Sequence, residues 1–401
     1  MSVAHTTVGA GDRASPWSAV VSVSLGAFAL VTSEFLPVGL LPQIARDLRI
    51  TDGEAGLMVT MPGFLAAVAA LLTPVVTARR DRRSVLLALL VLLAASNAVV
   101  ALAGNLPMLL LGRVLLGIAV GGFWTIGGSV GPRLRPGAEG VRATSIIFSG
   151  VSLGTVAGVP AGALIGGMIG WRWSFAGGAI MALVALCALA ARLPSLPAQP
   201  GTGLRQIPAL LKHRIALTGL VATALLFVGQ FATYTYVTPF LNQVANIHAG
   251  TVSAVLLGYG VAGFAGNALG GWAAGRDVRK ALSITALIVG GSVVLLALTG
   301  AHPAAAVVAV IAWGVGFGMM PIAMQTWLFS ATPDRLESMA SLFVSIAQLS
   351  LGTGALLGGL VVDHLGVAAT MWMGGAMAIA TAALIFQSEH GRRVVSVACC
   401  D

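Results

Sequence analysis

The sequence has 401 residues, of which 57% are hydrophobic and only 9% are charged, and its formal net charge is +9. Soluble domains carry about 25% charged residues, and the mean hydropathy of this chain is +0.95. This composition excludes a soluble enzyme, a disordered chain and a secreted disulfide scaffold. The three cysteines lack the spacing of a metal site or a disulfide framework. We therefore expect an all-α membrane protein with no metal and no cofactor.

A helix needs about 20 apolar residues to cross the hydrocarbon core of a bilayer, and twelve runs in the sequence meet that length. The first run follows a polar stretch and is too long for a signal peptide, so we expect it to remain as a membrane helix. The runs do not alternate between apolar and polar residues, which excludes a β-barrel. The predicted spans cover residues 17–41, 56–78, 84–104, 107–131, 143–168, 173–193, 214–241, 251–275, 281–301, 304–330, 338–362 and 366–387.

Arginine and lysine are concentrated in alternate loops, and such a bias sets the orientation of a membrane protein. If both chain ends face the cytoplasm, the outside segments hold only Arg46, Arg49 and Arg172, and Arg113 falls within a span. This distribution explains the net charge without a nucleic-acid partner. The cytoplasmic segments then hold 18 of the 22 basic residues, namely Arg13, Arg79, Arg80, Arg82, Arg83, Arg133, Arg135, Arg142, Arg192, Arg205, Lys212, Arg214, Arg276, Arg279, Lys280, Arg335, Arg392 and Arg393.

The longest polar stretch divides the spans into two sets of six. We predict an N-terminal half at 1–193, a cytoplasmic linker at 194–213, and a C-terminal half with a short tail at 214–401. The halves resemble each other, since Leu153-Gly154-Thr155 matches Leu351-Gly352-Thr353 at an offset that recurs elsewhere in the chain. Parallel six-helix repeats favour a substrate site between two rocking halves near the middle of the membrane.

Two ionisable residues fall inside predicted spans, where an unpaired charge costs several kcal/mol. Glu34 lies about 10 Å and Arg113 about 9 Å from the same membrane face, at 1.5 Å per helical residue. We expect the two to face each other or to share a polar cavity, with Arg113 charged and Glu34 titrating as a proton-coupling carboxylate. The alternative is a static ion pair that fixes helix packing.

Span five carries glycines at a strict spacing of four residues. Such a stripe lets another helix approach closely, and the proline within it frees a carbonyl and bends the helix. Plain helix packing explains the stripe, and a role in conformational change is the further reading. The residues of this motif are Gly150, Gly154, Gly158, Pro160, Gly162 and Gly166.

Several strings resemble motifs of the major facilitator superfamily. The string 111–122 resembles its span-four arginine motif, which implies a proton-coupling role for Arg113. The span-five stripe resembles its antiporter motif, with Val159-Pro160 in place of the expected Gly-Pro pair. The loop 79–83 stands where the superfamily has its Gly-and-Asp motif. There Asp81, Arg82 and Arg83 either latch the cytoplasmic side between states or only set the topology.

Further strings of residues indicate which family within the superfamily the chain resembles. Residues 32–42, 121–124 and 170–175 resemble the twelve-helix drug:proton antiporter family, in its sugar and nucleoside efflux branch. Residues 192–197 and 229–236 are most similar to bacterial purine ribonucleoside efflux permeases. The resemblance covers about 17–387 and implies the twelve-helix major facilitator fold.

Polar and aromatic side chains within the spans are candidates for the wall of a substrate site. Amides pair with base edges or sugar hydroxyls, and aromatic faces stack on a purine. The alternatives are aromatic anchoring at the membrane interface and amides that tie helices together. The candidates are Phe123, Trp124, Gln230, Tyr234, Tyr236, Trp313, Gln325, Trp327 and Gln348.

No enzyme motif is present, and the chain has no room for a nucleotide-driven motor domain. We expect a secondary transporter of a bacterial cytoplasmic membrane, acting as a monomer, that exports a small polar solute in exchange for protons by alternating access. Purine ribonucleosides are the first candidate substrate, on the resemblance alone. The alternatives are drug or sugar efflux, a passive channel, and a non-transporting sensor.

Overall fold

The computed structural model describes residues 17–135, 138–197 and 210–388. Every regular element in these ranges is helical, and twelve helices are long and apolar enough to cross a membrane. The predicted all-α fold with twelve spans is therefore confirmed. The predicted linker falls mostly on residues 198–209, which lie outside the described ranges, as do both chain ends and the residue pair 136–137.

The first six spans are formed by seven helices and one π-helical segment, because span five is interrupted. The elements are α1 (Trp17–Leu48), α2 (Asp52–Val76), α3 (Arg82–Ala101), α4 (Leu106–Leu134), α5 (Ala138–Leu153), the π-helix η1 (Gly154–Gly158), α6 (Val159–Ile169) and α7 (Trp171–Arg192).

The last six spans begin with a broken helix, since span seven ends α9 at Tyr234 and resumes as α10 at Val237. The elements are α9 (Arg214–Tyr234), α10 (Val237–Gln243), α11 (Ala249–Ala274), α12 (Val278–Thr299), α13 (Pro303–Ala331), the 3₁₀ turn η3 (Pro333–Arg335), α14 (Leu336–Leu365) and α15 (Val367–Gln387).

Polar side chains fix where several helices begin. Thr51 and Glu54 form a capping box at the start of α2, and the Asn105 side chain accepts a 3.0 Å hydrogen bond from the Met108 N–H at the start of α4. Asp277 caps α12 in the same manner. These caps satisfy N–H groups that the first helical turn leaves without partners.

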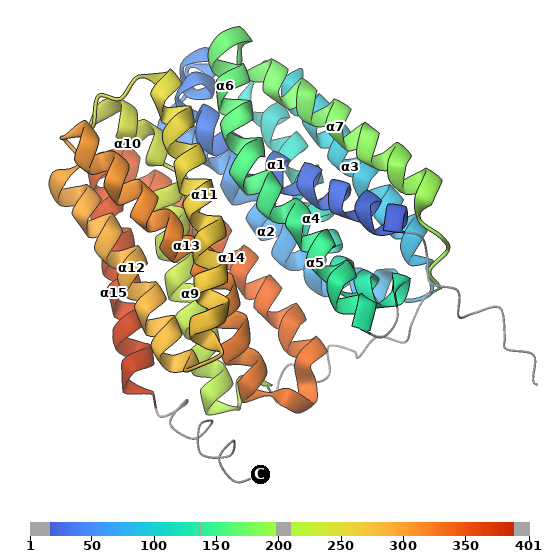
Figure 1. The fold of residues 1–401 in the computed structure, drawn as a ribbon. Helices are drawn as coiled ribbons and strands as arrows, with labels where there is room; N and C mark the ends of the chain where they lie inside the picture. Colours follow the sequence, from blue (N-terminus) through green and yellow to red (C-terminus); the bar gives the residue numbers. More distant parts are fainter. Residues whose placement is uncertain (1–16, 136–137, 198–209, 389–401) are drawn as a thin grey trace, which may run out of the picture.

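The helices form two groups that lie side by side (Figure 1). α1 to α7 pack mainly on one another, and so do α9 to α15. α2 joins the groups through α14, while α6 and η1 join them through α11. The apolar core of the second group also takes in Val38 and Leu41 of α1 and Val59 of α2. The two groups are thus in close contact at the end of the bundle where α1 ends and α2 begins, which we call the α1–α2 end.

The glycines of span five face α1. A Cβ added at Gly154 would lie 2.9 Å from the carbonyl oxygen of Phe28. Added Cβ atoms at Gly150 and Gly158 would likewise strike Ser24 and Thr32. The neighbouring helix that the stripe predicts is therefore α1. Pro160 lacks an N–H, and η1, where the helix widens to π geometry, ends two residues before it.

Candidate functional site

A buried carboxylate joins the two helix groups in the middle of the bundle. Glu34 of α1 is only 4% exposed. Its Oε1 accepts a hydrogen bond from Nε2 of Gln348 on α14 at 3.1 Å. The pair lies 314 residues apart in the chain. Because α1 belongs to one group and α14 to the other, any separation of the groups at this level must break the bond.

Arg113 of α4 is fully buried and donates to three main-chain carbonyls rather than to a carboxylate. Its Nε lies 2.6 Å from the oxygen of Met58, and its two terminal nitrogens lie 2.9 Å and 3.0 Å from the oxygens of Ser33 and Glu34. A guanidinium presents its donors as a rigid planar fork, which suits such an arrangement.

Two prolines explain why two of these carbonyls, those of Ser33 and Met58, are free. In an α-helix the carbonyl of residue i accepts from the N–H of residue i+4. Pro37 stands four residues after Ser33, and Pro62 stands four residues after Met58. Since proline has no N–H, both carbonyls lose their helical partner inside the membrane. Arg113 supplies the missing donors and ties α1 and α2 to α4.

The side chains of Arg113 and Glu34 do not bond to each other among the described residues, and the expectation that they face each other or share a polar cavity stays a prediction. The two residues do lie at the same level, because Arg113 binds the main-chain oxygen of Glu34. Within the described ranges no ion pair joins the guanidinium to the carboxylate. The alternative of a static Arg113–Glu34 ion pair is excluded in this conformation by the same observation.

An aromatic cluster lies next to the carboxylate. Phe35 of α1 stacks on Phe231 of α9, with ring centroids 5.8 Å apart and planes 6° apart. Tyr234 stacks on Tyr259 at 4.9 Å. Tyr234 also contacts the rings of Phe35, Trp313 and Phe317. The cluster, defined as Phe35, Phe231, Tyr234, Tyr259, Trp313 and Phe317, draws on α1, α9, α11 and α13 and includes both groups of helices.

Gln230 is held inside this cluster by both ends of its amide. Its Nε2 donates to the hydroxyl of Tyr259 at 2.9 Å, and its Oε1 accepts from the indole N–H of Trp313 at 2.7 Å. The side chain is fully buried. In this conformation Gln230 ties α9 to α11 and α13. This is the second of the two roles expected for amides within the spans, that of holding helices together.

Other sequence candidates also hold helices together. Tyr236 is fully buried and donates to the carbonyl of Ala355 at 2.8 Å. Trp327 donates to the carbonyl of Ile215 at 3.2 Å. Gln325 is half-buried on α13. These positions remain predictions as substrate contacts.

Phe123 and Trp124 lie farther along α4. Phe123 is ten residues beyond Arg113, which is about 15 Å along a helix axis. With Phe148 of α5 they line a cavity of about 10 Å³ within the first group. The structure places them apart from Glu34, so the two predicted parts of the site are not brought together.

The α1–α2 end is closed by hydrogen bonds between the groups. Asp363, near the end of α14, accepts from the hydroxyl of Thr51 at 2.8 Å and from the N–H of Gly53 at 3.1 Å. The amide of Gln243 donates to Asp52 at 2.9 Å. Asp363 thus lies at the N-terminus of α2, where a carboxylate is favoured by the helix dipole.

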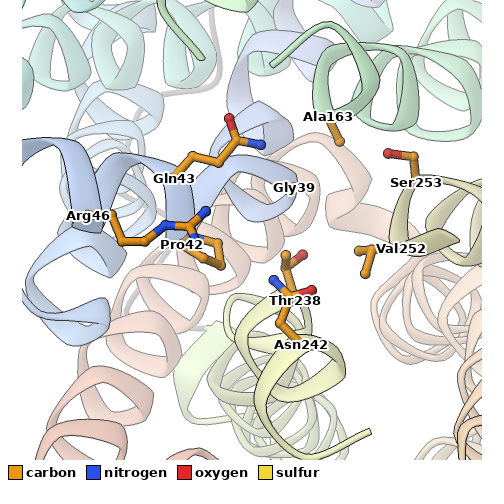
Figure 2. A pocket seen from close by; sticks show the side chains of 9 residues that line it. All are labelled: Gly39, Pro42, Gln43, Arg46, Ala163, Thr238, Asn242, Val252 and Ser253. Carbon is orange, nitrogen blue, oxygen red and sulfur yellow. The ribbon is translucent and has the colours of Figure 1, made fainter. Parts of the chain in front are cut away.

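A small pocket remains at this end (Figure 2). It lies between α1 and α6 on one side and α10 and α11 on the other. Its volume of about 30 Å³ admits one or two water molecules and is far too small for a nucleoside. The bundle is therefore closed to solutes here. The pocket is lined by Gly39, Pro42, Gln43, Arg46, Ala163, Thr238, Asn242, Val252 and Ser253.

The loop 79–83 binds the segment that follows α7. Asp81 accepts hydrogen bonds from the N–H groups of Arg83 and Leu196, at 2.7 Å and 3.0 Å, and from the hydroxyl of Ser195. Burial acts to raise the pKa of the Asp81 carboxyl, but these hydrogen bonds outweigh it and lower that pKa below its ordinary value. The Arg82 N–H donates to the Leu196 carbonyl.

These contacts stay within the first group of helices. The guanidinium of Arg83 donates to the carbonyl of Ala190 at 2.8 Å, and that of Arg82 donates to Thr77. These described hydrogen bonds do not reach the second group, and the role of the loop as a latch of the cytoplasmic side between states stays a prediction. In this conformation the loop holds the segment that leads into the linker.

Sequence reasoning missed several members of the site. Phe35 stands inside the string 32–42 and Phe231 inside the string 229–236. Both strings resemble family motifs, and that resemblance is a signal by which these two residues could have been found. Tyr259, Phe317 and Asp363 stand in helices without such a signal. Their roles depend on which faces of distant helices meet, which local sequence does not report.

A bundle of twelve candidate membrane spans, with a buried carboxylate bonded between two groups of helices, is the architecture of a membrane transporter. A family model described as Major Facilitator Superfamily matches residues 23–350 and 221–396. The chain belongs to the major facilitator superfamily.

Similar proteins include one named as a purine ribonucleoside efflux pump. That protein, NepI of Salmonella paratyphi B, is 35% identical over 92% of this chain and 93% of its own length. The transcription regulatory protein OpdE of Pseudomonas aeruginosa is 38% identical over 95% of this chain and 96% of its own length.

Solved structures agree on the fold. The crystal structure of the nucleoside transporter NupG, as a D323A mutant, aligns with a TM-score of 0.77 over 92% of this chain and 99% of that chain. The D-xylose-proton symporter aligns with a TM-score of 0.74 over 92% and 97%. Their sequence identities of 14% and 17% support the fold alone.

Proposed function

We propose that this protein exports a small polar solute, with purine ribonucleosides as the first candidate, in exchange for protons. The observation that carries the proposal is the hydrogen bond between Glu34 and Gln348 across the two groups of helices. A carboxylate buried at this depth is costly when ionised and marks proton pathways in transporters. Its protonation therefore has a large effect on how the groups pack.

The way the two groups meet supports alternating access as the transport mechanism. We propose that 1–193 and 214–401 act as two halves that rock about the central site. The contacts of Asp363 with Thr51 and Gly53 close the α1–α2 end in this conformation. The loop charges support both chain ends in the cytoplasm, which makes the α1–α2 end, closed in this conformation, the outer one.

The substrate assignment is supported by the relative named as a purine ribonucleoside efflux pump. The aromatic cluster beside Glu34 offers flat faces on which a purine stacks, and Gln348 offers a planar amide that matches the donor and acceptor edge of a base. Efflux of drugs or sugars on the same fold is the alternative. We propose that the protein acts as a monomer in a bacterial cytoplasmic membrane.

A non-transporting sensor is the second candidate function. A relative of 38% identity is named as a transcription regulatory protein, and that observation favours this candidate over a passive channel. A sensor needs a ligand site and two conformations but no transport cycle. Binding of a solute without its movement across the membrane would separate it from the transporter.

The test of the proposed function is uptake of labelled inosine into everted vesicles with an acid interior, compared with vesicles that lack the protein. Accumulation that an uncoupler abolishes is the expected result. Absence of uptake, together with uptake of a drug or a sugar from a panel, would overturn the nucleoside assignment. Absence of any uptake, with a solute still bound, would favour the sensor.

A further inference from the structure

Gln348 carries a buried acceptor that has no partner. The side chain is 7% exposed, and its Nε2 is engaged by Glu34 at 3.1 Å. Its Oε1 is buried and has no hydrogen-bond partner among the described residues. Burying an amide oxygen without a partner is unfavourable, and such atoms in a native structure call for an explanation. A bond that forms only at another step of the cycle provides one.

The protonation state of Glu34 decides which end of the amide it can engage. An ionised carboxylate only accepts hydrogen bonds, so it engages Nε2 and leaves Oε1 open, and the arrangement in the structure is compatible with that state. A protonated carboxyl gains an O–H donor, and a rotated Gln348 amide can accept it through Oε1. The acceptor is therefore open when Glu34 is ionised and occupied when Glu34 is protonated.

We propose that Gln348 makes proton and solute mutually exclusive, because its Oε1 binds either the O–H of protonated Glu34 or an N–H of the solute. The solute class is one with a planar N–H donor on its edge, as nucleobases have. This inference rests on the proposed function and deepens it. Exclusion of one ligand by the other is the coupling that exchange transport requires.

The other polar and charged groups near Glu34 are bound to other partners, so Gln348 is the residue that can respond to its protonation. The charged group next to Glu34 is Arg113 of α4, and its guanidinium is already bound to three main-chain carbonyls. On α3, Asn97 donates to the hydroxyl of Ser33 at 2.8 Å. On α9, Tyr234 reaches this part of α1 through its ring contact with Phe35. Among these neighbours, the described hydrogen bond to the Glu34 carboxylate comes from Gln348.

The test measures binding of labelled inosine to the purified full-length protein at a series of pH values. The wild type is expected to bind more weakly as the pH falls, since protonated Glu34 occupies the acceptor. Gln348→Met keeps the size of the side chain and removes both ends of the amide. It is expected to weaken binding about tenfold or more, as for one buried hydrogen bond, and to remove the pH dependence.

The matched control is Thr353→Val on the same helix. The hydroxyl of Thr353 donates at 2.8 Å to Leu349 of its own helix, so affinity and pH dependence should both match the wild type. If Gln348→Met keeps the wild-type pH dependence, this inference is overturned and the proposed function stands. If the wild type binds no inosine at any pH, the proposed function and this inference fail together.

A second measurement needs no solute. The infrared C=O band of protonated Glu34, identified by its absence in Glu34→Gln, reports the hydrogen bond that the carboxyl makes. Replacement of Gln348 by methionine should shift this band to higher frequency, while Thr353→Val should leave it in place. A band at the wild-type position in Gln348→Met would overturn the inference, even if that variant no longer binds inosine.

Discussion

The guanidinium of Arg113 donates a 2.9 Å hydrogen bond to the carbonyl of Ser33, the carbonyl that Pro37 leaves without a helical partner. Nε of the same guanidinium donates to the carbonyl of Met58, which stands four residues before Pro62. One buried arginine thus compensates two prolines on two helices. The proline breaks and the arginine depend on each other, and this dependence can be measured.

Arg113→Met is expected to lower the thermal midpoint of the purified protein by several degrees. Each buried carbonyl that loses its partner costs about 1–3 kcal/mol. In a Pro37→Ala background the helix regains an N–H for Ser33, so the same substitution should cost less. Equal costs in the two backgrounds, measured as a double-mutant cycle, would contradict this account of Arg113.

Gly154→Ala is expected to impair transport, because its new Cβ would lie 2.9 Å from the carbonyl oxygen of Phe28 on α1. Backbone atoms cannot move aside as a flexible side chain does, so span five and α1 must separate. The control is Gly167→Ala in the same span, where an added Cβ meets nothing within 4 Å. Similar transport rates for the two variants would rule out close packing as the role of the stripe.

Asp363→Ala is expected to open the α1–α2 end, because it removes the acceptor for Thr51 and Gly53. The measurement is the rate at which a membrane-impermeant maleimide, added to whole cells, labels Thr238→Cys in a background without native cysteines. Thr238 lines the pocket at this end and is 3% exposed. Labelling should accelerate in the Asp363→Ala variant.

The control for that experiment is Asp277→Asn. Asp277 accepts from the N–H of Lys280 at 3.0 Å and caps only its own helix. It should leave the labelling rate unchanged. Equal labelling of Thr238→Cys with and without Asp363 would show that this aspartate does not hold the end closed.

Asp81 is expected to make stability depend on pH. Its pKa in the folded protein lies below the ordinary value of 3.8, through the hydrogen bonds from Ser195, Leu196 and Arg83. A lowered pKa contributes stability above the unfolded value, and that contribution is lost as the pH falls through the folded one. In the acid range below about pH 4, the thermal midpoint of the wild type should fall more steeply than that of Asp81→Asn.

Much of the fold follows from the sequence, because hydropathy alone determines which segments enter the membrane. The twelve predicted spans correspond one to one to the twelve candidate spans of the structure, with bounds that differ by several residues. The shared level of Glu34 and Arg113 was also predictable, since it depends only on the count of residues along each helix. Their side-chain partners were not, because the direction in which a residue points depends on how each helix is rotated against its neighbours.

The prolines show the same limit. Pro37 and Pro62 are visible in the sequence, and the carbonyls they free can be counted four residues upstream. Which donor reaches those carbonyls depends on tertiary packing. The hydrogen bond between Glu34 and Gln348 joins residues 314 positions apart. Both residues were candidates by their polarity within a span, but nothing local in the sequence pairs them.

In the proposed cycle, protonation of Glu34 drives export. Uptake of labelled inosine into everted vesicles with an acid interior tests this when the wild type, Glu34→Asp and Glu34→Gln are compared. We expect uptake that an uncoupler abolishes in the wild type, reduced but uncoupler-sensitive uptake in Glu34→Asp, and no accumulation in Glu34→Gln at an equal amount of folded protein. Accumulation by Glu34→Gln at the wild-type level, still abolished by the uncoupler, would contradict it and return Glu34 to a structural role.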